Sequence, residues 1–233
     1  TIVTTGTTTR SSIRDVGNGW YYITFSSVMT TAAAVTPAFT IRDLSNNPSY
    51  TGDGSSGYYI WGVQVEQGAF PTSYIPTAAT TVTRNSDSLI INSLSPWIGL
   101  HEGSFTLRTS TFGSRAAWGY VQLWDGSTSN RIGIINVGGV LSGNVNVSSV
   151  NQASIGAAPP SGTFNTSLSY LENNITLALG GHIYNDTSAL LPTVTQLKIG
   201  GSSGGGTELN GWMGSFKYYP ARVTDTQLQL LTQ

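Results

Sequence analysis

The chain has 233 residues, of which 39% are apolar and only 9% charged, and ten Lys and Arg against eleven Asp and Glu leave a net charge of −1. This composition lacks the basic surplus that neutralises a phosphate backbone, so nucleic acid is not an expected partner. No apolar run approaches the roughly 18 residues that a membrane-spanning helix needs, so membrane insertion is not expected. Cysteine is absent, which excludes disulfides, thiolate nucleophiles and cysteine-based zinc sites.

Alternating apolar and polar residues predict β-strands in several segments. In chain order, these segments are 20–25, 58–65, 104–108, 119–124 and 193–199. Between them lie the turn sequences Gly17-Asn18-Gly19, Asp53-Gly54, Asp125-Gly126 and Gly138-Gly139. Many short strands without intervening helices predict an all-β chain built from antiparallel sandwiches.

The C-terminal residues depart from this strand pattern and predict one short helix. Thr224 and Gln227 have the spacing of a capping box, in which each side chain bonds the other residue's backbone N–H. Asp225 lies in the first turn, where the helix dipole favours an anion. The expected apolar face consists of Leu228, Leu230 and Leu231. We expect this helix to close one end of a sandwich.

A proline-containing segment marks the expected boundary between two modules. Pro71 and Pro76 hold the backbone extended, and small and hydroxylated residues follow as far as Thr83. We call residues 71–83 the strap and expect Tyr74 and Ile75 to pin it to a surface. The predicted domains are residues 1–77 and 84–233, with a linker at 78–83.

The first module carries four motifs in a fixed order. They are residues 17–23 (GNGWYYI), 49–54 (SYTGDG), 59–66 (YIWGVQVE) and 70–77 (FPTSYIPT). This order resembles the C-terminal half of a carbohydrate-binding-module-like jelly roll found in tailed-phage virion proteins. The resemblance implies a jelly-roll segment over residues 1–77.

The second module resembles a laminin-G or concanavalin A-like sandwich. The residues that carry the likeness are 83–87 (TRNSD), 102–105 (EGSF), 125–126 with 130–132 (DG and NRI), 209–212 (LNGW) and 218–222 (YYPAR). In such phage proteins this sandwich follows the jelly roll directly. The resemblance therefore implies a jelly-roll or β-sandwich segment followed by a concanavalin-like sandwich with a short C-terminal helix.

The jelly-roll resemblance also implies missing strands. Only about 16 residues precede the Gly17-Asn18-Gly19 turn, whereas the module of that family begins well upstream. Half a jelly roll exposes sheet edges and an unfilled core. Since the chain begins at Thr1 without Met, we expect either a removed upstream segment or cover from neighbouring copies, as in a fibre trimer.

The sequence offers no recognisable catalytic set, so we expect this chain not to be an enzyme. His101 and His182 lie far apart in sequence and belong to no triad motif. Glycoside hydrolysis needs two neighbouring carboxylates, and no Glu-x-Asp or Asp-x-Glu pair exists. A depolymerase whose acids converge from distant positions stays an alternative. The glycine-rich segment 200–206 has no following Lys-Ser or Lys-Thr, so it predicts a hairpin rather than a phosphate cradle.

Aromatic and planar polar side chains suggest candidate carbohydrate contacts. In the first module, strand alternation separates Tyr21 from Trp20, and Tyr58 from Trp61. We expect Trp61 to share a core face with Tyr59, Val63 and Val65. Tyr21 and Tyr58 are therefore the better exposed candidates of this module.

In the second module, the candidates surround one turn. Trp124 closes a predicted strand, Asp125 and Asn130 bound the turn, and Arg131 starts the next strand. Such a turn could recognise hydroxyl groups or hold a calcium ion through carboxylate and carbonyl ligands. The alternative is a plain hairpin turn.

The two resemblances suggest a function. They imply a virion protein, such as a fibre, spike or head appendage, that adheres to host cell-surface polysaccharide at the particle surface. Its expected partners are that polysaccharide, other virion proteins and further copies of itself in a trimer. A purely structural head-decoration or tail component is the first alternative, because fold does not fix function. A polysaccharide depolymerase is the second.

Overall fold

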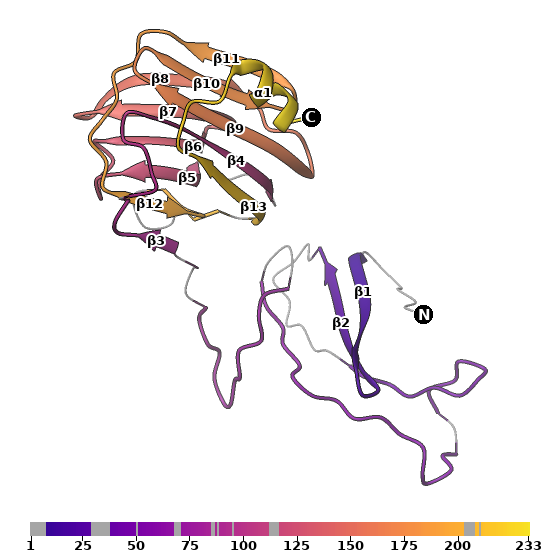
Figure 1. The fold of residues 1–233 in the computed structure, drawn as a ribbon. Helices are drawn as coiled ribbons and strands as arrows, with labels where there is room; N and C mark the ends of the chain where they lie inside the picture. Colours follow the sequence, from indigo (N-terminus) through magenta and orange to yellow (C-terminus); the bar gives the residue numbers. More distant parts are fainter. Residues whose placement is uncertain are drawn as a thin grey trace. The chain divides into compact units, whose positions relative to one another are not determined.

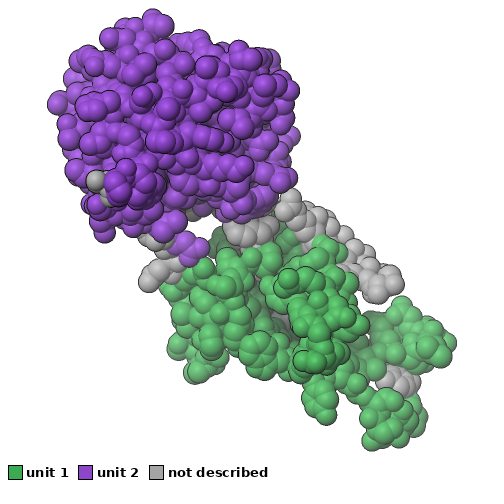
Figure 2. All heavy atoms as spheres, viewed as in Figure 1, with its two compact units in different colours: residues 1–84 green, residues 85–233 purple. Residues whose placement is uncertain are grey.

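A computed structural model describes residues 8–28, 38–49, 51–67, 71–84, 87, 89–94, 96–111, 117–202, 208–209 and 211–233. The chain divides into two compact units, Thr1–Arg84 and Asn85–Gln233, which Figure 2 shows in different colours.

Unit 2 is a sandwich of two antiparallel sheets (Figure 1). The five-stranded sheet has the order β11-β10-β9-β4-β13 and the six-stranded sheet the order β3-β12-β5-β6-β7-β8. In sheet order, the first consists of His182–Asp186, Asn174–Leu179, Thr163–Leu171, Glu102–Thr111 and Gly211–Tyr219. The second consists of Leu89–Ile91, Gln196–Ile199, Ala117–Trp124, Arg131–Val137, Val140–Val147 and Val150–Ala157. The described chain is therefore all-β apart from one short helix, as the strand periodicity predicts.

The core of unit 2 lies between these sheets. Phe105 and Leu107 of β4 and Leu168 of β9 belong to the same buried cluster as Val121 and Leu123 of β5. Each strand contributes alternate residues to the cluster, because successive side chains of a strand point to opposite faces. Alternation also places Gln122 and Trp124 of β5 on the face of the six-stranded sheet that points away from the core.

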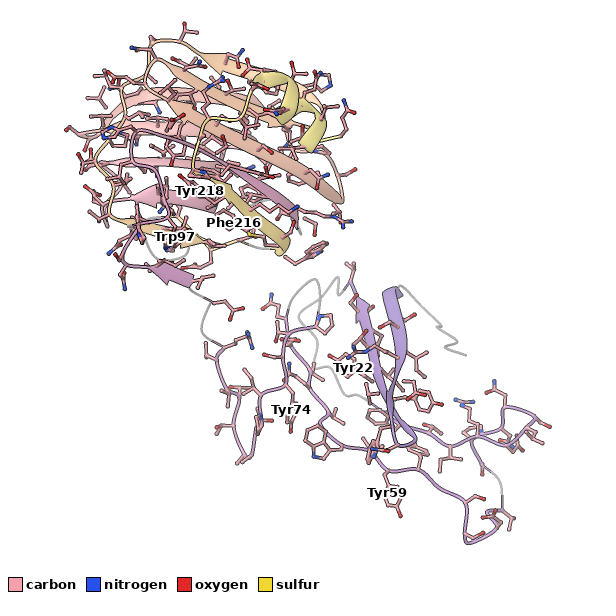
Figure 3. The ribbon with its side chains drawn as sticks, in the orientation of Figure 1. Tyr22, Tyr59, Tyr74, Trp97, Phe216 and Tyr218 are labelled. Carbon is pink, nitrogen blue, oxygen red and sulfur yellow. The ribbon has the colours of Figure 1, made fainter. Side chains whose placement is uncertain are left out.

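Aromatic side chains gather at β13, the edge strand of the five-stranded sheet (Figure 3). Phe216 and Tyr218 pack against the core, and the rings of Trp97 and Tyr218 meet edge to face at 6.4 Å. The Tyr218 hydroxyl accepts a hydrogen bond from the backbone N–H of Gly99 at 2.7 Å, while Tyr170 donates to the Gly99 carbonyl at 2.6 Å. Burial, with the Tyr218 hydroxyl beside it, raises the pKa of Tyr170 far above its ordinary range. These bonds fix the loop that precedes β4.

The predicted C-terminal helix is α1, Asp225–Leu231, and the capping box is formed as predicted. Leu228 is fully buried and the helix packs against β9 and β10. Leu230, expected on the same apolar face, is instead exposed, because residues two apart point to nearly opposite sides of a helix. A membrane-spanning helix is absent from the described part of the chain, where α1 is the sole helix.

Unit 1 contains one described hairpin, formed by β1 (Thr8–Gly17) and β2 (Trp20–Ser27). The turn between them places Asn18 and Gly19 at positive φ, the backbone geometry of a two-residue hairpin loop. Side chains on both faces of the hairpin are exposed, including Ile23 and Phe25 on one face and Tyr22 on the other. Two strands alone do not make a stable sheet in water.

The strand predicted at residues 58–65 is not formed, and the core face predicted there is wrong. Tyr59, Val63 and Val65 are exposed, and Trp61 is 75% exposed. No strand of the described residues pairs with this segment. It therefore has neither the backbone hydrogen bonds of a strand pair nor a facing sheet that would bury its side chains. The exposure agrees with the open core expected of half a jelly roll. Assignment of unit 1 to that module stays a prediction.

The predicted pinning of the strap within unit 1 is confirmed. The Tyr74 ring lies 5.0 Å from the Trp61 ring, and the Ile75 N–H donates to Gln64 Oε1 at 2.8 Å. The Glu66 carboxylate accepts the Thr72 N–H and hydroxyl, both at 2.6 Å. The strap is thereby tied to residues 61–66 by two rings and three hydrogen bonds.

Candidate ligand-binding face

We call the side of the six-stranded sheet that points away from the core the outer face. Strand register defines its rows, because directly opposed residues of antiparallel strands share a face. One row crosses the sheet through Lys198, Gln122, Gly133, Asn144 and Ser154. The next row contains Gln196, Trp124, Arg131, Asn146 and Asn151. The two rows thus gather amides, two cations and one indole on a single surface.

Several polar groups of these rows are buried without hydrogen-bond partners. Gln122 is 0% exposed, and neither its amide nitrogen nor its amide oxygen has a hydrogen-bond partner among the described residues. Trp124 is 8% exposed, and its Nε1 also has no hydrogen-bond partner in the described part of the chain. A buried polar group that makes no hydrogen bond costs about 1–3 kcal/mol, so such groups are rare unless a ligand or water completes them.

The two cations of the outer face are held in place by neighbouring groups. Lys198 is 8% exposed, donates from Nζ to the Ser202 carbonyl at 2.6 Å, and has its Nζ 5.7 Å from the centre of the Trp124 ring. Arg131 donates from Nε to Asn144 Oδ1 at 2.9 Å. Burial lowers the pKa of the Arg131 guanidinium, which nevertheless stays protonated at neutral pH.

Part of the outer face is accessible. Arg131, Gln196 and Asn146 are partly exposed, whereas Gln122 and Lys198 of the neighbouring row are buried. A ligand that contacts the exposed side chains would therefore have unsatisfied donors and acceptors next to it. The accessible part of the arrangement combines amides with a guanidinium, which are groups that bind the hydroxyls of a sugar.

Among the predicted site residues, Trp124 and Arg131 are brought together as cross-strand partners on the outer face. Trp124, a predicted carbohydrate contact, is largely buried, since it is only 8% exposed. β12 and β6 flank it on both sides and the Lys198 side chain lies over its ring. Its partly exposed cross-strand partner Arg131 is more accessible to a ligand than the indole is.

Asp125 and Asn130 form the turn between β5 and β6. Asp125 accepts the N–H and hydroxyl of Ser127 at 2.8 and 2.7 Å, and Asn130 Nδ2 donates to its other oxygen at 2.8 Å. These hydrogen bonds, from Ser127 foremost, lower the pKa of Asp125. The bonds are those of a hairpin turn that satisfies its own carboxylate. Three or more Asp, Glu or His side chains do not gather anywhere in the described residues.

Tyr21 and Tyr58 belong to unit 1 and are 56% and 49% exposed. The prediction that both are better exposed than the tryptophans is wrong with respect to Trp61, which is 75% exposed, and right with respect to Trp20, which is 46% exposed. Tyr21 lies opposite Asp15 in the hairpin, and the neighbouring Tyr22 has the Arg14 guanidinium 5.7 Å from its ring centre (Figure 3).

Sequence reasoning missed Gln122, Lys198, Gln196 and Asn144. A signal was present, because Gln122 and Trp124 alternate with Val121 and Leu123, and Gln196 and Lys198 alternate with Leu197. That pattern indicates which side chains leave the core. It does not reveal that β12 pairs with β5, which is what places Lys198 beside Gln122.

No protein-family model matches the chain, and no curated protein matches it. Several solved structures are similar to the chain. The chain is 12% identical to a leech intramolecular trans-sialidase complexed with 2,7-anhydro-Neu5Ac, at a TM-score of 0.50, over 63% of this chain and 27% of the leech chain. It is 14% identical to the CBM40 of Ruminococcus gnavus IT-sialidase bound to α2,3-sialyllactose, at a TM-score of 0.48, over 58% and 84%.

A botulinum neurotoxin serotype D/C binding domain is 11% identical, at a TM-score of 0.45, over 57% of this chain and 36% of that one. At such identities the likeness concerns the fold alone, and the leech match supports a β-sandwich. The chain spans about a quarter of the leech protein.

Proposed function

We propose that unit 2 binds glycans on its outer face. The observation that carries the proposal is the fully buried, unpartnered amide of Gln122, in the row next to Trp124 and Arg131. Sugar hydroxyls donate and accept at once, so they can complete both amide atoms. Arg131 supplies further donors, because its terminal nitrogens make no hydrogen bond among the described residues.

The first experiment measures binding to a glycan array and then titrates the strongest ligand by calorimetry. The sialylated ligands of the solved structures belong among the first sugars to be tested. The decisive variant is R131Q, with R108Q as its control, because Arg108 is exposed on the five-stranded sheet. We expect R131Q to weaken binding about 10-fold and R108Q to leave it unchanged. Equal effects of both variants would remove the outer face as the site.

We further propose that the chain acts at the surface of a virion, as part of a fibre, spike or head appendage that adheres to host polysaccharide. The motif order of residues 17–77 and the sandwich that follows support this. Weak sites repeated on a multimer gain roughly 10²–10⁴ in avidity. Electron microscopy of the assembled particle tests the proposal, and antibody label found nowhere on the particle would refute it.

The exposed aromatic side chains of unit 1, on the hairpin and on residues 58–65, support our further proposal that the chain self-associates. Copies that cover these side chains would bury apolar surface at about 25 cal/mol per Å². We therefore expect a trimer by light scattering, and a monomer with cooperative unfolding would argue against it.

The two alternatives make different predictions. A purely structural component would bind no glycan as an isolated trimer. A depolymerase would release reducing ends from host polysaccharide, and substitution of its acids would abolish that release.

A further inference from the structure

Lys198 is a buried cation that pairs with no carboxylate of the described residues. The chain has two lysines, and the other, Lys217, is exposed on β13. In the described part of the chain, the Lys198 ammonium makes one hydrogen bond, to the Ser202 carbonyl, and no ion pair. Glu208 pairs through its backbone with Gly201, three residues after Lys198. Its carboxylate forms no salt bridge with Lys198 among the described residues.

Burying a charge is costly unless an opposite charge or several hydrogen bonds compensate it. An ammonium has three donors, of which the Ser202 carbonyl uses one. The Trp124 ring, 5.7 Å away, attracts the cation through its π face, a contribution of only about 0.5–2 kcal/mol. The site of Lys198 is therefore suited to an anionic group that arrives with a ligand.

The row of Lys198 indicates what kind of anion fits. Gln122, directly opposite, has an unused amide nitrogen, and Gly133 lies beyond it without a side chain. Arg131 of the adjacent row is a second cation. A carboxylate has two oxygens that accept several hydrogen bonds, so it can engage the ammonium and the amide together.

We propose that the glycan bound by the outer face carries a carboxylated sugar, a sialic acid or a uronic acid, whose carboxylate pairs with Lys198. This proposal rests on glycan binding by unit 2 and names its ligand class. Lys198 is then the residue that determines preference for acidic over neutral glycans.

The experiment compares each acid with its own methyl ester, which keeps the shape and removes the charge. The ligands are 3′-sialyllactose and trigalacturonic acid, titrated by calorimetry against the whole chain, K198Q and K217Q. We expect the whole chain to bind one acid about 10-fold or more tighter than its ester. In K198Q this ratio falls to about one while ester affinity stays within about 2-fold. K217Q keeps the full ratio.

A second measurement needs no variant. With two lysines in the chain, the 15Nζ resonances are few enough to assign. We expect the acid, and not the ester, to shift the Lys198 signal and leave that of Lys217 in place. This readout stands even where K198Q fails to fold.

The outcomes separate the two proposals. Equal affinity for acid and ester, or a K198Q protein that keeps the ratio, overturns the carboxylate proposal and leaves glycan binding intact. Absence of binding to every sugar of the array overturns glycan binding itself. The two acids distinguish a sialic acid from a uronic acid as the source of the carboxylate.

Discussion

Lys198 and Gln122 lie opposite each other on β12 and β5, and both side chains are buried on the outer face of the six-stranded sheet. Among the described residues, the ammonium has one hydrogen-bond partner and the amide has none. A sheet surface that had only to be stable would be better served by apolar or exposed residues at these positions. The pair is therefore the most direct structural indication of a ligand.

The first prediction concerns the free energy that the buried amide of Gln122 costs the folded chain. Replacing it by Leu removes two buried unpartnered polar atoms, so Q122L should raise the free energy of unfolding by about 1 kcal/mol. Urea denaturation measures this change. The same variant should weaken glycan binding about 3- to 10-fold, because the amide can no longer bond a hydroxyl. A destabilised Q122L with unchanged affinity would mean that the amide is structural.

The second prediction concerns the indole N–H of Trp124. W124F keeps an aromatic ring beside Lys198 and removes Nε1, which has no hydrogen-bond partner among the described residues. We expect a loss of about 1–2 kcal/mol in unfolding free energy from reduced packing. Glycan affinity should fall about 3- to 10-fold if the N–H donates to the ligand.

The control is W212F, since Trp212 is an exposed residue of β13 on the other sheet. Calorimetry of both variants compares their glycan affinities. An affinity loss of the same size in W212F would show that the effect does not come from the outer face.

The third prediction concerns acid sensitivity of the turn at Asp125. Because Ser127 and Asn130 lower its pKa in the folded chain, this carboxylate contributes stability above its ordinary pKa. The contribution is lost as the pH falls through the lowered folded value. Carboxyl 13C titration by NMR should give a pKa below the ordinary one, and S127A should return it toward that value. An unchanged pKa in S127A would refute the assigned cause.

The fourth prediction concerns the helix cap. T224A removes the side-chain oxygen that accepts the Gln227 N–H, so unfolding free energy should fall by about 1 kcal/mol. T226A, two residues later in the first turn of the helix and exposed, is the matched control and should change stability by less than about 0.5 kcal/mol. Denaturant unfolding of unit 2 measures both. Glycan affinity should be unaffected, because α1 packs on the five-stranded sheet.

The all-β class, the capping box at Thr224 and the pinned strap at Tyr74 and Ile75 could be predicted because they depend on local patterns. Alternation, a four-residue cap and two prolines act over short stretches of chain. The prediction of a strand at 58–65 was wrong because a strand depends on contacts with other parts of the chain. Its pattern is that of a strand, but a strand also needs a partner to bond and a sheet to face, and the described residues of unit 1 supply neither.

The candidate site divides in the same way. Local patterns predict that Asp125 and Asn130 bound a turn and that Arg131 follows it, and they contain the alternation that directs Gln122 and Trp124 away from the core. The burial of Trp124, and the position of Lys198 opposite Gln122, which lies more than 70 residues earlier in the chain, depend on how distant strands pair. The reason is that pairing between distant strands is fixed by the packing of the whole sandwich, and no local pattern encodes it.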